Sequence, residues 1–171
     1  MNTHAFFEYL ARRAEADTSV VATLRRSLMS DPGTFAEAFP LVEPFTQGVS
    51  ERDRRTVYLA AGLWASAQRR ESGPPLPLPS AMAKLRHDTG SASTEARFVA
   101  LLDADEDELV WRLRHAINLT SSAGQALDWP ALLQDLLRWT APARFVQQQW
   151  ARQFWQHSRA DEPETQTSIG N

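Results

Sequence analysis

The sequence contains no cysteine among its 171 residues. This absence excludes disulfide bonds, thiolate nucleophiles and cysteine-ligated zinc, and it fits a reducing cytoplasm. No run of about 18 apolar residues occurs, so the sequence predicts no membrane-spanning helix. The N-terminal residues lack the charged start, apolar centre and small-residue cleavage site of a signal peptide. We therefore expect a cytoplasmic protein with no attachment to a membrane.

Motifs for catalysis and for metal binding are missing as well. The sequence has no Gly-x-Ser-x-Gly elbow and no phosphate-cradling Walker loop, and its four histidines never pair at helical spacing. Asp103, Asp105 and Asp107 alternate as in a calcium loop. However, Glu108 occupies the position that requires glycine, and Arg114 occupies that of the closing glutamate. We therefore expect no enzymatic activity, no metal and no cofactor.

Lysine is almost absent, since Lys84 is the one lysine among 18 basic residues and all the others are arginines. The planar guanidinium group suits phosphate and stacks on bases, but a GC-rich coding bias would also replace lysine by arginine. The net charge of −3 arises from three acids in the last twelve residues, which leaves the rest of the chain neutral. Because nucleic-acid binding depends on local clustering, the positions of the arginines must identify any basic face.

Nearly the whole chain has the apolar periodicity of helices, and no alternation typical of strands is visible. Residues 35–45 form a proline-punctuated connector that we expect to contain short helical turns. The segment SGPPLPLP at residues 72–79 has four prolines, which favour an extended course. The predicted helices span about 3–16, 18–29, 50–70, 80–88, 94–102, 105–119, 129–139 and 142–157.

These elements predict an all-α fold with two parts. Residues 1–90 would form an N-terminal helical subdomain that includes the Pro-rich linker at 72–79. Residues 91–159 would form a C-terminal four-helix bundle, because short loops favour antiparallel neighbouring helices. Residues 160–171 lack apolar side chains and are predicted to be a disordered tail.

The segment LDWPALLQDLLRW, residues 127–139, carries a complete helix start. Asp128 can cap the helix, and Pro130 lies in the first turn, where a missing N–H group costs nothing. An apolar stripe at helical spacing follows and predicts a buried face. The stripe consists of Leu132, Leu133, Leu136, Leu137 and Trp139.

Several segments occur in an order that resembles a known family. LRRSL at 24–28, FPLVEPF at 39–45 and GSASTEARFVALLDAD at 90–105 precede RLRHA at 112–116 and the LDWP segment. Together they resemble the small subunit of the type I-E CRISPR Cascade surveillance complex, the CasB family, over about residues 6–155. The overall acidic character of the chain departs from strongly basic relatives.

The resemblance implies an all-helical, non-catalytic subunit of an RNA-guided antiviral complex in the prokaryotic cytoplasm. Such a subunit would bind nucleic-acid backbone non-specifically and stabilise the opened target DNA, the R-loop. The implied partners are the guide RNA and the target or displaced DNA strand. The implied protein partners are the ring-forming backbone subunit, the large subunit and a second copy of the chain.

Nine arginines are candidates for contacts with nucleic acid. Five follow from the resemblance: Arg25 and Arg26 in LRRSL, Arg97 before FVALL, and Arg112 and Arg114 in RLR. Four follow from helical phasing, which places them opposite the apolar stripe of the helix over 50–70 and in a strip about 27 Å long. These four are Arg52, Arg55, Arg69 and Arg70. A solvated charged face would have the same spacing.

Other functions remain open at this level. Trp111 shares the outward side of its helix with Arg114 and His115, where it could stack on a base or contact a subunit. A helical protein–protein adaptor without nucleic-acid binding is therefore the alternative function. A helix-turn-helix regulator would require a helix of base-reading side chains after a tight turn, and no predicted helix has that pattern.

Overall fold

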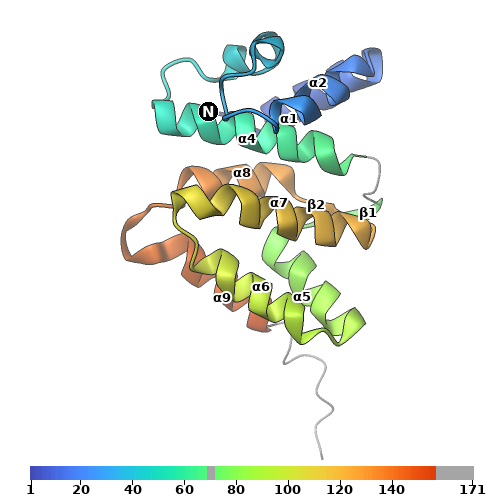
Figure 1. Ribbon diagram of the computed structural model, residues 1–171, viewed down its shortest axis with the longest axis vertical. Helices are drawn as coiled ribbons and strands as arrows, with labels where there is room; N and C mark the ends of the chain where they lie inside the picture. Colours follow the sequence, from blue (N-terminus) through green and yellow to red (C-terminus); the bar gives the residue numbers. More distant parts are fainter. Residues whose placement is uncertain (69–71, 157–171) are drawn as a thin grey trace, which may run out of the picture.

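The computed structural model describes residues 1–68 and 72–156, and helices make up most of it (Figure 1). An upper tier holds α1, α2 and α4, a middle tier α7 and α8, and a lower tier α5, α6 and α9. The α-helices are α1 (Thr3–Ala16), α2 (Ser19–Ser27), α3 (Phe39–Val42), α4 (Glu51–Ala67), α5 (Leu78–Thr89), α6 (Ala92–Leu102), α7 (Glu106–Ser122), α8 (Trp129–Leu137) and α9 (Phe145–Gln156). The 3₁₀ helices are η1 (Ala36–Ala38), η2 (Glu43–Phe45) and η3 (Pro142–Arg144), and the strands are β1 (Ser72–Leu76) and β2 (Gln125–Leu127). The all-α fold class is confirmed.

Side-chain caps set the starts of the long helices. Ser50 Oγ accepts from the Asp53 N–H group at 3.1 Å and begins α4. Asp128 Oδ1 accepts from the Ala131 N–H group at 3.0 Å and begins α8. These bonds satisfy amide groups that have no partner within the first turn, and the second confirms the cap predicted at Asp128.

The proline-rich segment takes the predicted extended course only up to Pro77, because Leu78 and Pro79 already belong to α5. The extended part forms strand β1, which pairs in parallel with β2. The Asp128 N–H group continues this contact by donating to the Leu76 carbonyl at 2.9 Å. The sequence does not reveal this pairing, because β2 spans only three residues between two helices and shows no alternation. The pairing holds the start of α5 beside the link between α7 and α8.

The helices associate differently from the predicted two-part arrangement. In the structure α5 packs against α6, α7 and α9, whereas the prediction placed it in the N-terminal subdomain. Helix α8 packs against α1 and α4, whereas the prediction placed it in the C-terminal bundle. The reason is that β1 leads the chain across to β2 before α5 begins. The division at residue 90 into folding units stays a prediction, and the predicted tail at 160–171 lies outside the described residues.

Helix α4 is the centre of the upper half. Every residue from Val57 to Ala65 is buried, because α2, α7 and α8 all pack against this helix. At Gly62 a Cβ atom would lie 2.6 Å from a Leu28 methyl group and 3.2 Å from the Leu24 carbonyl oxygen. Glycine thus lets α2 cross α4 closely, and it positions the C-terminal end of α2 beside α7.

Aromatic side chains fill the lower half of the core. Phe98 of α6 and Phe154 of α9 are fully buried and stack with ring centroids 4.1 Å apart. Trp150 of α9 is also fully buried, and its Nε1–H group donates to Asp135 of α8 at 2.7 Å. Burial raises the pKa of Asp135, while the bond from Trp150 opposes that rise. Helix α9 thereby contacts α6 in the lower tier and α8 in the middle tier.

Candidate nucleic-acid interface

Two candidate arginines meet where α2, α4 and α7 converge. Arg25 of α2 is exposed, and its Nη2 group donates to the Ala65 carbonyl of α4 at 3.4 Å. Arg114 of α7 donates from Nη2 to the Leu28 carbonyl at the end of α2. We call Arg25 and Arg114, with the neighbouring Arg26, the basic junction. Since carbonyl groups carry no net charge, the positive charges of Arg25 and Arg114 are not neutralised by these bonds.

The other exposed candidates on α2 and α6 have weak or neutral partners. Arg26 forms an ion pair with Glu37 of η1 at 2.6 Å, and the two side chains are 59% and 62% exposed. An ion pair that is this exposed contributes about 0–1 kcal/mol, so Arg26 can exchange Glu37 for another anion. Arg97 of α6 is exposed, and its Nη1 group donates to the Ser93 hydroxyl at 2.8 Å.

Two candidates are instead held by carboxylates. Arg52 of α4 donates from Nε to Glu106 of α7 at 2.6 Å, and from Nη1 to the Leu137 carbonyl of α8 at 3.3 Å. Arg112 of α7 pairs with Glu108 at 3.1 Å, one helical turn earlier. Arg52 connects α4 to α7 and to the end of α8, whereas Arg112 pairs within α7, and both charges are largely matched.

Over the part of α4 that the structure describes, the predicted strip is interrupted, and binding by Arg52 and Arg55 stays a prediction. Arg55 is exposed, but every residue from Val57 to Ala65 is buried by neighbouring helices. Phasing had identified one buried face correctly, whereas three helices cover α4 from several sides. Arg69 and Arg70 lie outside the described residues, and their role in binding stays a prediction.

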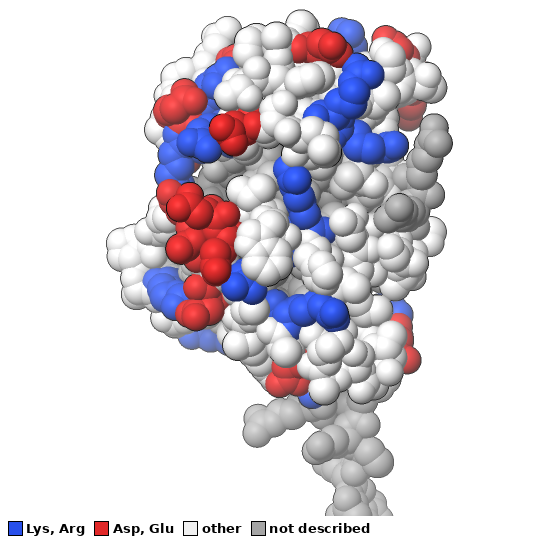
Figure 2. Space-filling model, in the orientation of Figure 1, with Lys and Arg blue, Asp and Glu red and all other residues white. Residues whose placement is uncertain are grey.

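The charges are unevenly distributed over one face of the molecule (Figure 2). Basic side chains occur at intervals from the region of α2 across α7 toward α5 and α6. Acidic side chains gather at the N-terminal end of α7, whose first turn holds Glu106, Asp107 and Glu108. A phosphate backbone that crosses this face would therefore be attracted to the basic junction and repelled by the start of α7.

A cluster at the start of α4 was missed by the sequence analysis. Arg54 donates through two nitrogen atoms to Glu43 of η2, and the Tyr58 hydroxyl donates to the same carboxylate at 2.8 Å. Mainly because of Arg54 and then Tyr58, the pKa of Glu43 falls to about 2. Burial, with a smaller effect of Glu43, raises the pKa of Tyr58. The signal in the sequence was a single acid inside the apolar segment FPLVEPF.

The described ranges, 1–68 and 72–156, contain neither a candidate metal site nor a candidate membrane-spanning helix. No three His, Asp or Glu side chains there are grouped so that they could hold a metal ion. None of the helices in these ranges is both long and apolar enough to cross a membrane.

Comparison with known proteins gives concordant matches. The family model described as CRISPR-associated protein Cse2 matches residues 20–155. A curated "CRISPR-associated protein Cse2" from Thermus thermophilus is 38% identical over 161 residues, which are 92% of each chain. The crystal structure of CasB from Thermus thermophilus is 37% identical, with a TM-score of 0.79 over 90% of this chain and 97% of that one. A chain from a structure titled "CRISPR RNA-guided surveillance complex" shares the fold, with a TM-score of 0.78 at 24% identity over 94% and 98% of the two chains.

Proposed function

The chain belongs to the Cse2 family of CRISPR-associated proteins, and from this membership we propose that it is the non-catalytic small subunit of an RNA-guided surveillance complex. In this role it binds nucleic-acid backbone without reading sequence and stabilises the opened target DNA. Its nucleic-acid partners are the guide RNA and the target or displaced strand. Its protein partners are the ring-forming backbone subunit, the large subunit and a second copy of itself. The fold shared with a chain of a surveillance complex supports this assignment.

The observation that carries the proposal is the basic junction. Arg25 and Arg114 come from different helices and donate to carbonyl groups, so neither positive charge is neutralised; Arg25 is exposed, whereas Arg114 is half-buried and its Nε atom is buried without a hydrogen-bond partner. Arg26 lies beside them on α2 and has an exposed ion pair that phosphate can replace. Guanidinium groups bind phosphate through paired N–H donors, and such contacts hold a backbone without selecting a base. Arg97 provides a further exposed charge on α6.

The energetics of DNA opening make a few such contacts sufficient. Pairing the guide with its target replaces base pairs of similar stability, so opening is a nearly balanced exchange. Phosphate contacts that form only with the separated strands shift this balance toward the open state. If four to six phosphates of a single strand are contacted, the logarithm of the binding constant should fall with the logarithm of salt concentration at a slope of about −3 to −4.

The direct test is the lifetime of the R-loop in the assembled complex. The double variant Arg25→Gln/Arg114→Gln removes two charges but keeps an amide donor for each carbonyl. Since a hydrogen bond to a charged group contributes about 1.5–3 kcal/mol, we expect the lifetime to shorten by at least about tenfold.

The matched control for this test is Arg112→Gln, because Arg112 lies on the same helix and is already paired with Glu108. Its R-loop lifetime should equal that of the wild type. Thermal melting of each variant separates a loss of binding from a loss of folding. An unchanged lifetime in the folded double variant would refute the proposed role of the basic junction.

A second candidate function is a protein–protein adaptor that does not bind nucleic acid. It is favoured by Trp111 of α7, which is 54% exposed although tryptophan is rarely so exposed outside interfaces. A gel-shift series with single- and double-stranded DNA at several salt concentrations separates the two functions. A pure adaptor would show no salt-sensitive shift.

A further inference from the structure

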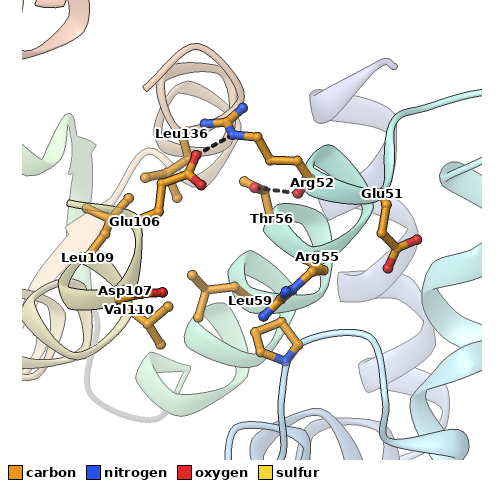
Figure 3. Close-up of a pocket in the computed structure, with 11 residues that line it drawn as sticks. Glu51, Arg52, Arg55, Thr56, Leu59, Glu106, Asp107, Leu109, Val110 and Leu136 are labelled. Carbon is orange, nitrogen blue, oxygen red and sulfur yellow. Dashed lines mark hydrogen bonds and ion pairs between the residues drawn. The ribbon is translucent and has the colours of Figure 1, made fainter. Parts of the chain in front are cut away.

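A hollow lies between the N-terminal halves of α4 and α7, with α8 at its base (Figure 3). Its volume is about 280 Å³. For comparison, a cavity of about 150 Å³ holds a benzene molecule, so this hollow can take one large side chain. We call it the acidic hollow, and its lining residues are Pro32, Glu51, Arg52, Arg55, Thr56, Leu59, Glu106, Asp107, Leu109, Val110 and Leu136.

The interior of the acidic hollow is largely apolar. Leu59 of α4 and Val110 of α7 approach each other across it, and Leu136 of α8 lies at its back (Figure 3). The ion pair between Arg52 and Glu106 crosses one end, so these two charges neutralise each other. An apolar side chain that entered the hollow would therefore bury its surface without separating a charged pair.

Two rim residues keep unmatched charges of opposite sign. Arg55 on the α4 side and Asp107 on the α7 side are both exposed, and neither has an ion-pair partner among the described residues. Asp107 belongs to the acidic first turn of α7, and Figure 2 shows the acidic side chains gathered there. The α7 rim is thus negative and repels phosphate, whereas the α4 rim carries the unpaired Arg55 together with Glu51, which pairs with Arg54 at 3.3 Å.

Trp111 follows on α7, beyond the residues that line the hollow. It lies one helical turn after Asp107, so the two side chains share one side of α7. The Arg112 guanidinium carbon lies 4.5 Å from the centre of the Trp111 ring and covers one of its faces. The side chain is nevertheless 54% exposed. A large, exposed aromatic side chain on the helix that forms one wall of the hollow is the kind of residue that dominates binding at protein interfaces.

We propose that the acidic hollow receives a short segment of a neighbouring protein subunit, with an apolar side chain inside it and a basic side chain against Asp107 and Trp111. Charge complementarity identifies the occupant, because the α7 rim favours a cation and disfavours nucleic acid. Arg55 on the opposite rim repels the basic side chain and so sets the direction in which the segment lies. The inference rests on the proposed role as a subunit of a larger complex, and it separates a protein-binding face from the basic junction.

The test measures association of the chain with the guide-RNA-bound complex assembled from the other subunits, in the absence of target DNA. Asp107→Arg reverses the charge of the α7 rim and should weaken association at least tenfold. Thr56→Phe fills the hollow without a change of charge and should also weaken association about tenfold. The Thr56 hydroxyl bonds only to the Arg52 carbonyl of its own helix, so the fold does not depend on it.

The control is Glu8→Arg, which makes the same change of charge at an exposed position of α1, away from the lining residues of the hollow. This variant should associate within twofold of the wild type. Wild-type association of both Asp107→Arg and Thr56→Phe, each shown to be folded by thermal melting, would overturn the proposal. The proposal would also be overturned if these two variants associated normally with the other subunits but lost self-association of the free chain, because the occupant would then be a second copy.

The two proposals fail in different ways. Binding of single-stranded DNA by the free chain should be as strong or stronger in Asp107→Arg, because the variant has gained positive charge. If the docking variants associate normally while the variants of the basic junction lose DNA, the acidic hollow is refuted alone. If the reverse is observed, the nucleic-acid role is refuted alone.

Discussion

The cluster at the start of α4 and the basic junction use the same residue type for opposite purposes. Arg54 faces a carboxylate, a phenol and a carbonyl, and its charge is matched by Glu43. Arg25 and Arg114 face carbonyl groups, and their charges are not matched. The difference shows that the partner of an arginine, rather than its presence on a helix face, decides whether it holds the fold or remains available to a ligand.

Position along the chain explains why the two regions differ. The cluster joins the connector at η2 to α4, and Arg54 also stacks 5.0 Å from the centre of the Tyr58 ring. The connector has no long helix of its own, so these contacts attach it to the core. At the basic junction the helices are already packed through Leu24, Leu28 and Gly62, so the arginines there are not needed for attachment.

The largest expected effect that would sharpen this comparison is on stability. Arg54→Ala removes the two-nitrogen partner of Glu43 and the guanidinium group over the Tyr58 ring, and leaves only the side-chain bonds from Tyr58 and Thr46 on the Glu43 carboxylate. We expect the free energy of unfolding to fall by about 2 kcal/mol. Partial exposure of the Glu43 carboxylate keeps the loss from being larger. Chemical denaturation would measure the loss. Arg25→Ala should change stability by less than about 0.5 kcal/mol, and equal losses in the two variants would remove the distinction.

The next effect is the dependence of stability on pH. The pKa of Glu43 is about 2 in the folded protein and 4.5 for an ordinary glutamate. Because the folded-state value is the lower one, the contribution of Glu43 is complete above about pH 4.5 and is lost as the pH falls toward 2. We expect the melting temperature of the wild type to fall more steeply over this range than that of Glu43→Gln. Parallel curves would show that the cluster does not hold Glu43 ionised.

The smallest effect concerns the salt dependence of DNA binding by the free chain. Arg25→Gln/Arg114→Gln should reduce the slope of log K against log salt by about 1.4, since each contacted phosphate of a single strand contributes about 0.7. Arg112→Gln should leave the slope unchanged, because Arg112 is already paired. Binding titrations at four or more salt concentrations would measure both slopes. A reduced slope in Arg112→Gln would mean that paired arginines also reach phosphate.

Much of the local structure could be predicted from the sequence. The bounds of α1 were predicted to the residue, and the starts of α4 and α8 follow from Ser50 and Asp128. Of the predicted apolar stripe, Leu132, Leu133, Leu136 and Trp139 are buried and Leu137 is half-buried. The resemblance to the CasB family agrees with the Cse2 family match. Caps and apolar spacing act within a few residues, which is why they can be read from a short window of sequence.

The candidate site was harder to predict for a physical reason. Helical phasing assigned Arg52 to an open strip, yet Glu106 lies 54 positions away in the chain and reaches it from α7. Phasing identifies the side of a helix opposite to one apolar stripe, but it cannot show how many other helices cover the remaining sides. The match of short strings located Arg25 and Arg114, although it could not show that both donate to carbonyl groups.

The sequence by itself determined the helical content, the starts of α1, α4 and α8, the main apolar faces and the family, because each depends on residues close together or on their order along the chain. Only the tertiary structure decided which arginines meet a carboxylate, how β1 carries α5 to the opposite half, and where α4 and α7 leave a hollow. Those features depend on distances between segments that are remote in sequence. Because charges interact through space, an arginine whose neighbour is a carboxylate has its charge matched, whereas an arginine whose neighbour is a carbonyl group stays positive.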